Sequence, residues 1–358
     1  MKYIDCDVHH NVPDIEAIFP YLPRKYKEQV EIFGIGIPMQ ISSLNGGVNG
    51  RRADSYPSNG KLPGTNLPLM ASQHLDPFNI EYGILTGEFQ WATVTPDTYY
   101  SAALCSALND YTIEHWLEKD ARLRGSIYVP IHDPVAAVKE IERLGSHPLM
   151  VQVLAPAGTK MPYGQKFYHP IYEACERHNL PFTIHVGSEG HGINPSPTGV
   201  GYPSYYVEFR ALRQQVYMAH MASFVFEGVF ELFPKLKVVF LEAGVFWIAP
   251  YLWHLDQDWR GLRYQTPWVQ KKPSEYFQTN MYVGSQPVEE VPNPNLFMPM
   301  MESVYARDRM LFASDYPHWD YDSPKLAFPK MDKELAENIF YNNAADLYGL
   351  PKNEVKGA

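Results

Sequence analysis

The sequence predicts a single-domain α/β protein, a (β/α)8 TIM barrel with long loops at its mouth. Short apolar runs alternate eight times with longer segments of helical periodicity along the 358 residues, which is the order of a parallel barrel. Three of the apolar runs end in carboxylates or histidines, at the strand ends where barrels of this kind place their functional residues. A barrel of this length commonly forms one domain, so we expect residues 1–358 to be one unit.

The expected strands are short apolar runs closed by proline, glycine or a polar residue, and span residues 2–9, 81–86, 124–129, 149–154, 182–186, 237–241, 280–283 and 309–313. Helical periodicity predicts helices over residues 71–78, 98–119, 170–179, 205–233, 246–259, 294–305 and 332–348, and another that begins at Asp133, an N-cap followed by Pro134. Residues 11–69 break this rhythm with recurring proline and glycine, so we expect an inserted functional loop or lid there.

Composition excludes several classes of partner. Lysine and arginine number 30 against 40 acidic residues, a net charge of −10, and the basic residues form no stripe, so we expect no binding to nucleic acid or to an anionic membrane. The three cysteines lack CxxC spacing and are expected to be core thiols. The first residues form a strand pattern rather than a signal peptide, and no apolar run has the length of a membrane span, so we expect a cytoplasmic protein with a small-molecule substrate.

Four residues at the ends of the first, fifth and eighth strands predict a metal site. Asp7 and His9 follow each other two residues apart, and His185 and Asp315 close later strands. Together they offer nitrogen and oxygen ligands that are scattered in sequence, as is typical of a site built from strand ends. A lone histidine at a strand end is more often structural, but four such residues at matching ends favour metal binding. Asp5 is expected to belong to a buried polar network instead.

Four motifs resemble the amidohydrolase superfamily, and more narrowly the amidohydrolase-related branch that contains aminocarboxymuconate-semialdehyde decarboxylase and γ-resorcylate decarboxylase. They are Asp-x-Asp-x-His at residues 5–9, Thr-Ile-His-Val-Gly at 183–187, Phe-Pro-Lys-Leu-Lys-Val-Val-Phe-Leu-Glu-Ala-Gly at 233–244 and Phe-Ala-Ser-Asp-Tyr-Pro-His-Trp at 312–319. The resemblance implies one divalent ion on Asp7, His9, His185 and Asp315, with zinc as the first expectation and manganese or iron as alternatives. Strand four offers no lysine that could bridge two metals, which favours a mononuclear site.

Glu242 departs from the pattern of the decarboxylases, which carry a histidine at this position. A second anion serves the decarboxylation of an anionic substrate poorly, whereas a carboxylate can relay protons during hydrolysis. We therefore expect a metal-dependent hydrolase of a small aromatic or carbonyl-containing substrate, with Asp315 and Glu242 as proton carriers. The alternative is a non-oxidative, metal-dependent decarboxylase of an aromatic or enol acid. Glu242 has a structural alternative too, as the partner of an arginine or a brace for a ligand histidine.

Further site residues are predicted from their places in the chain. His318 lies three residues beyond Asp315 and is expected to orient the substrate or donate a proton, with a surface role as the alternative. The resemblance places a carboxylate-binding arginine in the first insertion, where Arg51 and Arg52 stand. His191, in the glycine-rich loop after the fifth strand, is a further candidate for substrate contact.

Two further points concern the assembly of the protein and the third functional class. The resemblance and the aromatic residues of segment 268–277, which lies outside the barrel rhythm, predict a homodimer. A metal-binding protein without catalysis is the third functional class, and the intact set of predicted ligands argues against it.

Overall fold

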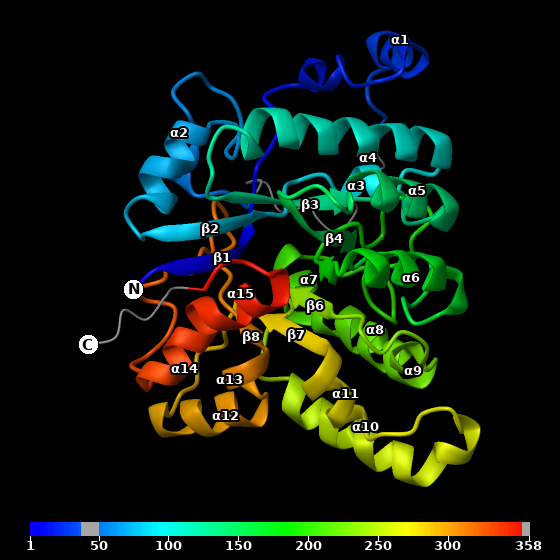
Figure 1. The fold of residues 1–358 in the computed structure, drawn as a ribbon, viewed down its shortest axis with the longest axis vertical. Coiled ribbons are helices and arrows are strands. Elements are labelled where there is room, and N and C mark those ends of the chain that lie inside the picture. Colours follow the sequence, from blue (N-terminus) through cyan, green and yellow to red (C-terminus); the bar gives the residue numbers. More distant parts are fainter. Residues whose placement is uncertain (37–49, 353–358) are drawn as a thin grey trace.

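The computed structural model describes residues 1–36 and 50–352. Eight parallel strands follow one another around a barrel in sequence order, and the helices lie outside them (Figure 1). Backbone hydrogen bonds join the first strand to the segment of the last, from Cys6 N–H to the Phe312 carbonyl at 2.9 Å and from His9 N–H to the Tyr316 carbonyl at 2.7 Å. The predicted (β/α)8 barrel is therefore confirmed. Its strands are β1 Tyr3–Val8, β2 Ile80–Leu85, β3 Leu123–Tyr128, β4 Met150–Pro156, β5 Phe182–His185, β6 Val238–Leu241, β7 Met281–Gly284 and β8 Met310–Leu311.

Most of the long helices lie in the predicted regions, whereas the short helices α2 (Leu67–Met70), α3 (Gln90–Thr93) and α13 (Ala306–Arg309) lie outside them. The side chain of Asp133 accepts a hydrogen bond from Ala136 N–H at 3.1 Å, as expected of an N-cap. The helices are α1 Arg24–Phe33, α2 Leu67–Met70, α3 Gln90–Thr93, α4 Thr98–Thr112, α5 Pro134–Leu144, α6 His169–His178, α7 Tyr206–Leu212, α8 Gln214–Phe226, α9 Val229–Leu232, α10 Ile248–Leu262, α11 Pro273–Asn280, α12 Phe297–Ser303, α13 Ala306–Arg309, α14 Lys333–Glu337 and α15 Asn343–Tyr348.

Two regions differ from the sequence-based expectation. The single helix expected over residues 205–233 is divided into α7, α8 and α9, and Gly228 ends α8 with a left-handed φ of 72°. A Cβ atom on Gly228 would lie 2.5 Å from the ring of Trp268, so the turn also requires glycine for space. The insertion expected over residues 11–69 contains the helix α1, of which only Tyr26 and Val30 are buried. Part of that insertion, residues 37–49, lies outside the described residues.

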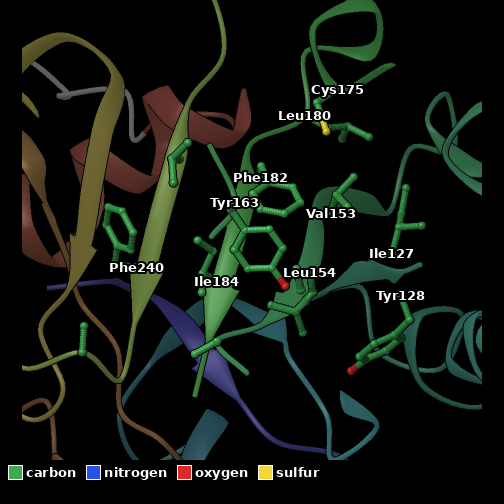
Figure 2. Packing of buried hydrophobic residues seen from close by; sticks show 14 of the residues in the cluster. Ile127, Tyr128, Val153, Leu154, Tyr163, Cys175, Leu180, Phe182, Ile184 and Phe240 are labelled. Atoms are coloured by element: carbon green, nitrogen blue, oxygen red, sulfur yellow. The ribbon is translucent and has the colours of Figure 1, made fainter. Parts of the chain in front are cut away.

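Aromatic and aliphatic side chains fill the space between the strands and the outer helices (Figure 2). The rings of Tyr163 and Phe182 meet edge to face with centroids 5.2 Å apart. A polar layer crosses the strands as well, because Gln152 on β4 bonds to Ser126 at 2.8 Å and accepts from Thr183 at 2.6 Å. The three cysteines are buried and unpaired, as expected.

The segment that motivates the homodimer prediction is only partly exposed. Tyr276 and Phe277 are buried, with 3% and 0% exposure, whereas Trp268 is 49% exposed. The indole N–H of Trp268 donates to the Phe226 carbonyl at 2.9 Å. The aromatic residues here therefore pack largely within the chain, and the homodimer stays a prediction. Among the helices of residues 1–36 and 50–352, none is both long and apolar enough to cross a membrane.

Candidate metal centre and active site

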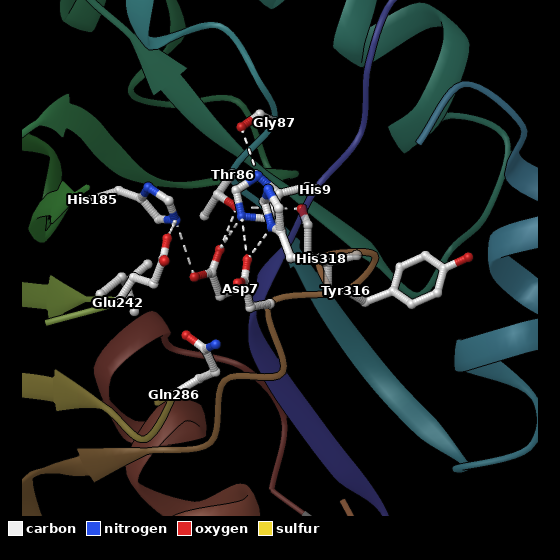
Figure 3. Close-up of polar contacts among 12 residues, drawn as sticks. Asp7, His9, Thr86, Gly87, His185, Glu242, Gln286, Tyr316 and His318 are labelled. Carbon is white, nitrogen blue, oxygen red and sulfur yellow. Dashed lines mark hydrogen bonds and ion pairs between the residues drawn. The ribbon is translucent and has the colours of Figure 1, made fainter. Parts of the chain in front are cut away.

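The four predicted ligands lie together at the mouth of the barrel. Figure 3 labels three of them, Asp7, His9 and His185. All four are buried, and their ligand-type atoms lie within 4.8 Å of one another. His9 Nε2 is 3.0 Å from Asp315 Oδ1 and 3.3 Å from Asp7 Oδ1, and His185 Nε2 is 3.2 Å from Asp7 Oδ2. Strand ends that are far apart in sequence thus meet at one point, as the barrel geometry requires.

Neighbouring groups fix the orientation of the two imidazoles and of Asp7. His9 Nδ1 lies 2.9 Å from the Gly87 carbonyl, and His185 Nδ1 lies 2.7 Å from the Val186 carbonyl. Each Nδ1 therefore carries the proton that it donates, so Nε2 is the nitrogen of each ring that faces the cluster. Thr86 donates its hydroxyl to Asp7 Oδ1 at 2.5 Å.

The atoms directed at the centre fit a divalent ion. Asp7 Oδ2, His9 Nε2, His185 Nε2 and Asp315 Oδ2 are buried and have no hydrogen-bond partner within the described part of the chain. Four buried, unpaired ligand atoms at one point are costly for a protein unless a ligand satisfies them. Two imidazole nitrogens and two carboxylate oxygens are a ligand set that suits borderline and hard divalent metals.

The electrostatics of the cluster agree with this fit. Burial opposes ionisation of Asp7, but His185 and His9 hold the pKa of Asp7 well below its usual value. Burial likewise opposes protonation of His185, yet the attraction of Asp7 raises its pKa to about 9. The carboxylates thus create a negative potential that attracts positive charge to this point, and a divalent cation is one way to supply that charge.

A buried network holds the two strand ends that carry the cluster. The carboxylate of Asp5, which is fully buried, accepts backbone N–H groups of Asp7 at 3.2 Å and of Ser314 at 2.9 Å. Its other oxygen lies 2.6 Å from His74 Nε2. Asp5 therefore links β1 to the segment after β8 from behind the cluster, which confirms the expectation of a network carboxylate.

His318 extends the site outward from Asp315. Its Nδ1 makes a short hydrogen bond with Asp315 Oδ1, and its Nε2 lies 3.4 Å from Glu88 Oε1. Glu88 also lies 2.6 Å from an Arg51 guanidinium nitrogen and 3.1 Å from His9 Nδ1. The predicted proton donor is therefore in contact with a predicted ligand, and the alternative of an isolated surface position does not hold.

Glu242 is the partner of an arginine, the structural alternative that the sequence left open. Its Oε1 accepts a short hydrogen bond from Arg213, and Arg210 lies 3.7 Å from the same oxygen. Its Oε2 lies 3.6 Å from His185 Nε2, so the carboxylate also borders the metal cluster. Glu242 and Asp315 both have left-handed backbone φ angles, 53° and 61°, a strained state that recurs at functional sites.

A cavity of about 420 Å³ opens beside the cluster, a size that suits a small molecule. Arg51 and His191 line it together with residues that the sequence did not single out, among them Glu88, Arg210 and Arg213. Glu88 could have been found, because it follows the second strand directly. The two α7-region arginines have no local pattern that marks them.

Arg52 is a predicted substrate contact, but it does not line the cavity. Its guanidinium pairs with Asp54 at 2.7 Å and lies 4.7 Å from the ring centroid of Tyr321. Of the two neighbouring arginines, Arg51 therefore lines the cavity and Arg52 does not.

A barrel with buried histidine and carboxylate ligands at its strand ends defines a class of enzymes that use a metal at the mouth. The chain belongs to the amidohydrolase family, whose model matches residues 4–350. It is thus an enzyme of the amidohydrolase superfamily, as the sequence motifs predict.

Several known proteins align with most of this chain. It is 23% identical to the γ-resorcylate decarboxylase of Polaromonas sp. over 298 residues, which cover 77% of this chain and 85% of the relative. The corresponding enzyme of Rhodococcus jostii is 23% identical over 307 residues, 78% of this chain and 86% of the relative. The 2,6-dihydroxybenzoate decarboxylase from Rhizobium superposes with a TM-score of 0.69 at 17% identity, covering 98% of this chain and 99% of that one.

A further solved structure, the 5-carboxyvanillate decarboxylase from Novosphingobium aromaticivorans, has a TM-score of 0.69 at 18% identity and covers 97% of this chain and 96% of that chain. It is complexed with manganese and 4-hydroxy-3-methoxy-5-nitrobenzoic acid. These structural likenesses support the fold. The expectation of a hydrolase is matched only at the level of the superfamily.

Proposed function

We propose that this protein is a metal-dependent, non-oxidative decarboxylase of an aromatic hydroxy acid, the alternative rather than the first expectation from the sequence. The observation that carries the proposal is the buried ion pair of Glu242 with Arg213. Without a counter-ion, the carboxylate of Glu242 would repel a substrate carboxylate, which is why the sequence favours hydrolysis. Its charge is offset by Arg213, so this objection to an acidic substrate no longer applies. The similar proteins named above, all decarboxylases of aromatic acids, support the same choice.

Asp7, His9, His185 and Asp315 would hold one divalent ion. Manganese joins zinc as a leading candidate because relatives are described with it, and the nitrogen and oxygen ligands suit both metals. When bound, the ion would supply a Lewis acid for the substrate carboxylate and a neighbouring hydroxyl.

The chain's own residues then have definite tasks. Decarboxylation breaks the bond between the ring carbon and the carboxylate carbon, carbon dioxide leaves, and the electron pair stays on the ring carbon. That carbon must receive a proton, and the Asp315 and His318 pair is placed to hold and deliver it. Arg51, with its guanidinium beside Glu88 on the cavity wall, is placed to orient the acid.

Hydrolysis is the second candidate because Glu242 Oε2 lies only 3.6 Å from His185 Nε2, where a carboxylate could relay protons from water. Isotope labelling separates the two. Metal-loaded protein is incubated with a panel of hydroxybenzoic acids and aromatic amides, once in D₂O and once in ¹⁸O water. A decarboxylase releases carbon dioxide and places solvent deuterium on the ring carbon. Incorporation of ¹⁸O into an organic product without release of carbon dioxide would contradict the proposal.

A further inference from the structure

The carboxylate of Glu88 lies on the cavity wall between two residues to which the proposed function gives separate tasks. Its Oε1 is 2.6 Å from Nη2 of Arg51, which is placed to orient the acid, and 3.4 Å from Nε2 of His318, which is placed to deliver a proton. The side chains of Glu88, Arg51 and His318 are 23%, 11% and 16% exposed, and all three line the cavity, so a substrate can reach them. The proposed function gives Glu88 itself no task.

The backbone holds Arg51 and His318 side by side. The two residues form an antiparallel bridge, and the neighbouring Arg52 N–H donates to the Pro317 carbonyl at 3.0 Å. Side chains of directly opposed residues in such a pair lie on the same face. The part of the insertion that carries Arg51 is therefore fixed to the segment after β8, and both side chains reach Glu88.

A tight turn after β2 presents Glu88 to this pair. Gly87 has a left-handed φ of 60°, and a Cβ atom there would lie 2.9 Å from His10 Cε1, so the turn requires glycine. The Gly87 carbonyl also faces His9 Nδ1 at 2.9 Å, which fixes the turn to the end of β1. Glu88 thus approaches the pair from a separate strand end.

The Oε1 atom of Glu88 is shared among its neighbours. Nitrogens of Arg51, His9 and His318 lie within 3.4 Å of it. It nevertheless forms no hydrogen bond of regular angle within the described part of the chain. The carboxylate is therefore a counter-ion to the whole group and is not committed to Arg51 alone.

The ring of His318 has one firm hydrogen bond and needs a second contact to be fixed. Its Nδ1 makes the short hydrogen bond with Asp315, and the ring meets that of His9 edge to face with centroids 4.4 Å apart. A single hydrogen bond lets an imidazole swing, whereas a carboxylate at each nitrogen fixes the plane of the ring. Glu88 supplies the second carboxylate. Misplacement of a reacting group by about 1 Å can cost about 10²-fold in rate.

We propose that Glu88 is a positioning residue, which holds the ring of His318 in the orientation that delivers the proton, while Arg51 balances the charge of Glu88. This inference rests on the proposed function for the tasks of Arg51 and His318. It predicts that Glu88 acts on proton delivery rather than on the affinity for the acid or for the metal.

Hydrogen exchange on the decarboxylated product separates proton delivery from acid binding. In D₂O, the pair of Asp315 and His318 would take the proton from the ring carbon and return a deuteron to the same carbon, while the electron pair of the C–H bond stays on the ring. The product has no carboxylate, so this exchange does not need Arg51. Manganese-loaded protein is incubated with resorcinol, and ring deuterium is followed by NMR against a protein-free sample. The acid 2,6-dihydroxybenzoate serves for kcat and KM.

Glu88→Gln should lower both the exchange rate and kcat by about tenfold or more and leave the metal content unchanged. It should not raise KM, because it also removes a negative charge from beside the acid. Arg51→Met should raise KM by about tenfold and keep the exchange rate within about threefold. Asp54→Asn is the matched control, since Asp54 pairs with Arg52 at 2.7 Å away from the cavity, and it should change none of these values.

Glu88→Asp, which keeps the charge but shortens the side chain, should give a smaller loss of exchange, and it serves as the test if Glu88→Gln fails to fold. Unchanged exchange and kcat in the Glu88 variants, a loss of activity that matches a loss of bound metal, or a rise in KM with kcat unchanged would each overturn the inference. Wild-type protein that exchanges no ring hydrogen would overturn it too. If no acid releases carbon dioxide but resorcinol exchanges deuterium in a way that depends on Glu88, the proposed function fails and the positioning role stands.

Discussion

Replacement of Glu242 by glutamine distinguishes a counter-ion from a proton carrier. Glu242 and Arg213 are 5% and 2% exposed, and they form a buried ion pair. Removal of one partner of such a pair costs about 3 to 5 kcal/mol, because the remaining charge is left buried without compensation. Since the glutamine amide oxygen can still accept one N–H from Arg213, we expect a loss of about 3 kcal/mol. For a chain of 358 residues, that corresponds to a decrease in Tm of about 4 °C.

The double variant Glu242→Leu with Arg213→Met provides the compensating control. An apolar pair of similar volume is often as stable as a buried ion pair, so the double variant should recover most of the lost stability. Thermal unfolding, metal content and kcat are measured for the three proteins. If Glu242→Gln keeps its Tm and its metal but loses about 10²-fold or more in kcat, Glu242 carries protons and the hydrolase hypothesis regains its basis.

Four further variants test other parts of the structure. His185→Ala should lose both the bound ion and activity, and elemental analysis showing an unchanged metal content would contradict the proposed ligand set. Arg51→Met should lower kcat/KM by about tenfold or more through lost orientation of the acid, whereas Arg52→Met, which alters a residue off the cavity, should leave it within about twofold. Burial lowers the pKa of His220 from 6.5 to about 4, so the unfolded chain binds a proton that the folded chain does not as the pH falls between those values. Between pH 6.5 and about 4, protonation of His220 in the unfolded chain should therefore lower the unfolding free energy by about 1.4 kcal/mol for each unit that the pH falls. The variant His220→Gln should lack this contribution to the pH dependence of the unfolding free energy, which denaturant titrations at several pH values would measure.

The fold could be predicted because each strand is a short apolar run and each long helix has an apolar face. Helix α1 was not predicted because most of its residues are charged or polar and only Tyr26 and Val30 are buried, and because it lies in a segment rich in proline and glycine. The break between α8 and α9 lies at Gly228, where the ring of Trp268, forty residues away in the sequence, leaves no space for a Cβ atom. Such long-range contacts leave no local pattern.

The cluster of predicted ligands could be located from the sequence because parallel strands converge at one end of a barrel. Asp7 and His9 lie at the end of β1, His185 ends β5 and Asp315 lies in the segment after β8, so their spatial proximity follows from the topology of the barrel. The arginines of the cavity wall could not be located in this way. Arg213 stands between two helices and meets Glu242 only through the packing of α7 and α8 against the end of β6, which no spacing rule describes.

The pairing of Glu242 with Arg213 explains why the reaction expected from the sequence, hydrolysis, differs from the proposed reaction, decarboxylation. From the sequence, Glu242 is an isolated anion, and an isolated anion disfavours an anionic substrate. In the folded chain, its charge belongs to a pair with Arg213, just as that of Glu88 belongs to a pair with Arg51. The repulsion that a substrate carboxylate meets depends on the net charge of each pair, which is close to zero, rather than on the acidic residue alone. The effect of one acidic residue on a charged substrate therefore depends on its counter-ion, and here Arg213 removes the repulsion that favoured hydrolysis.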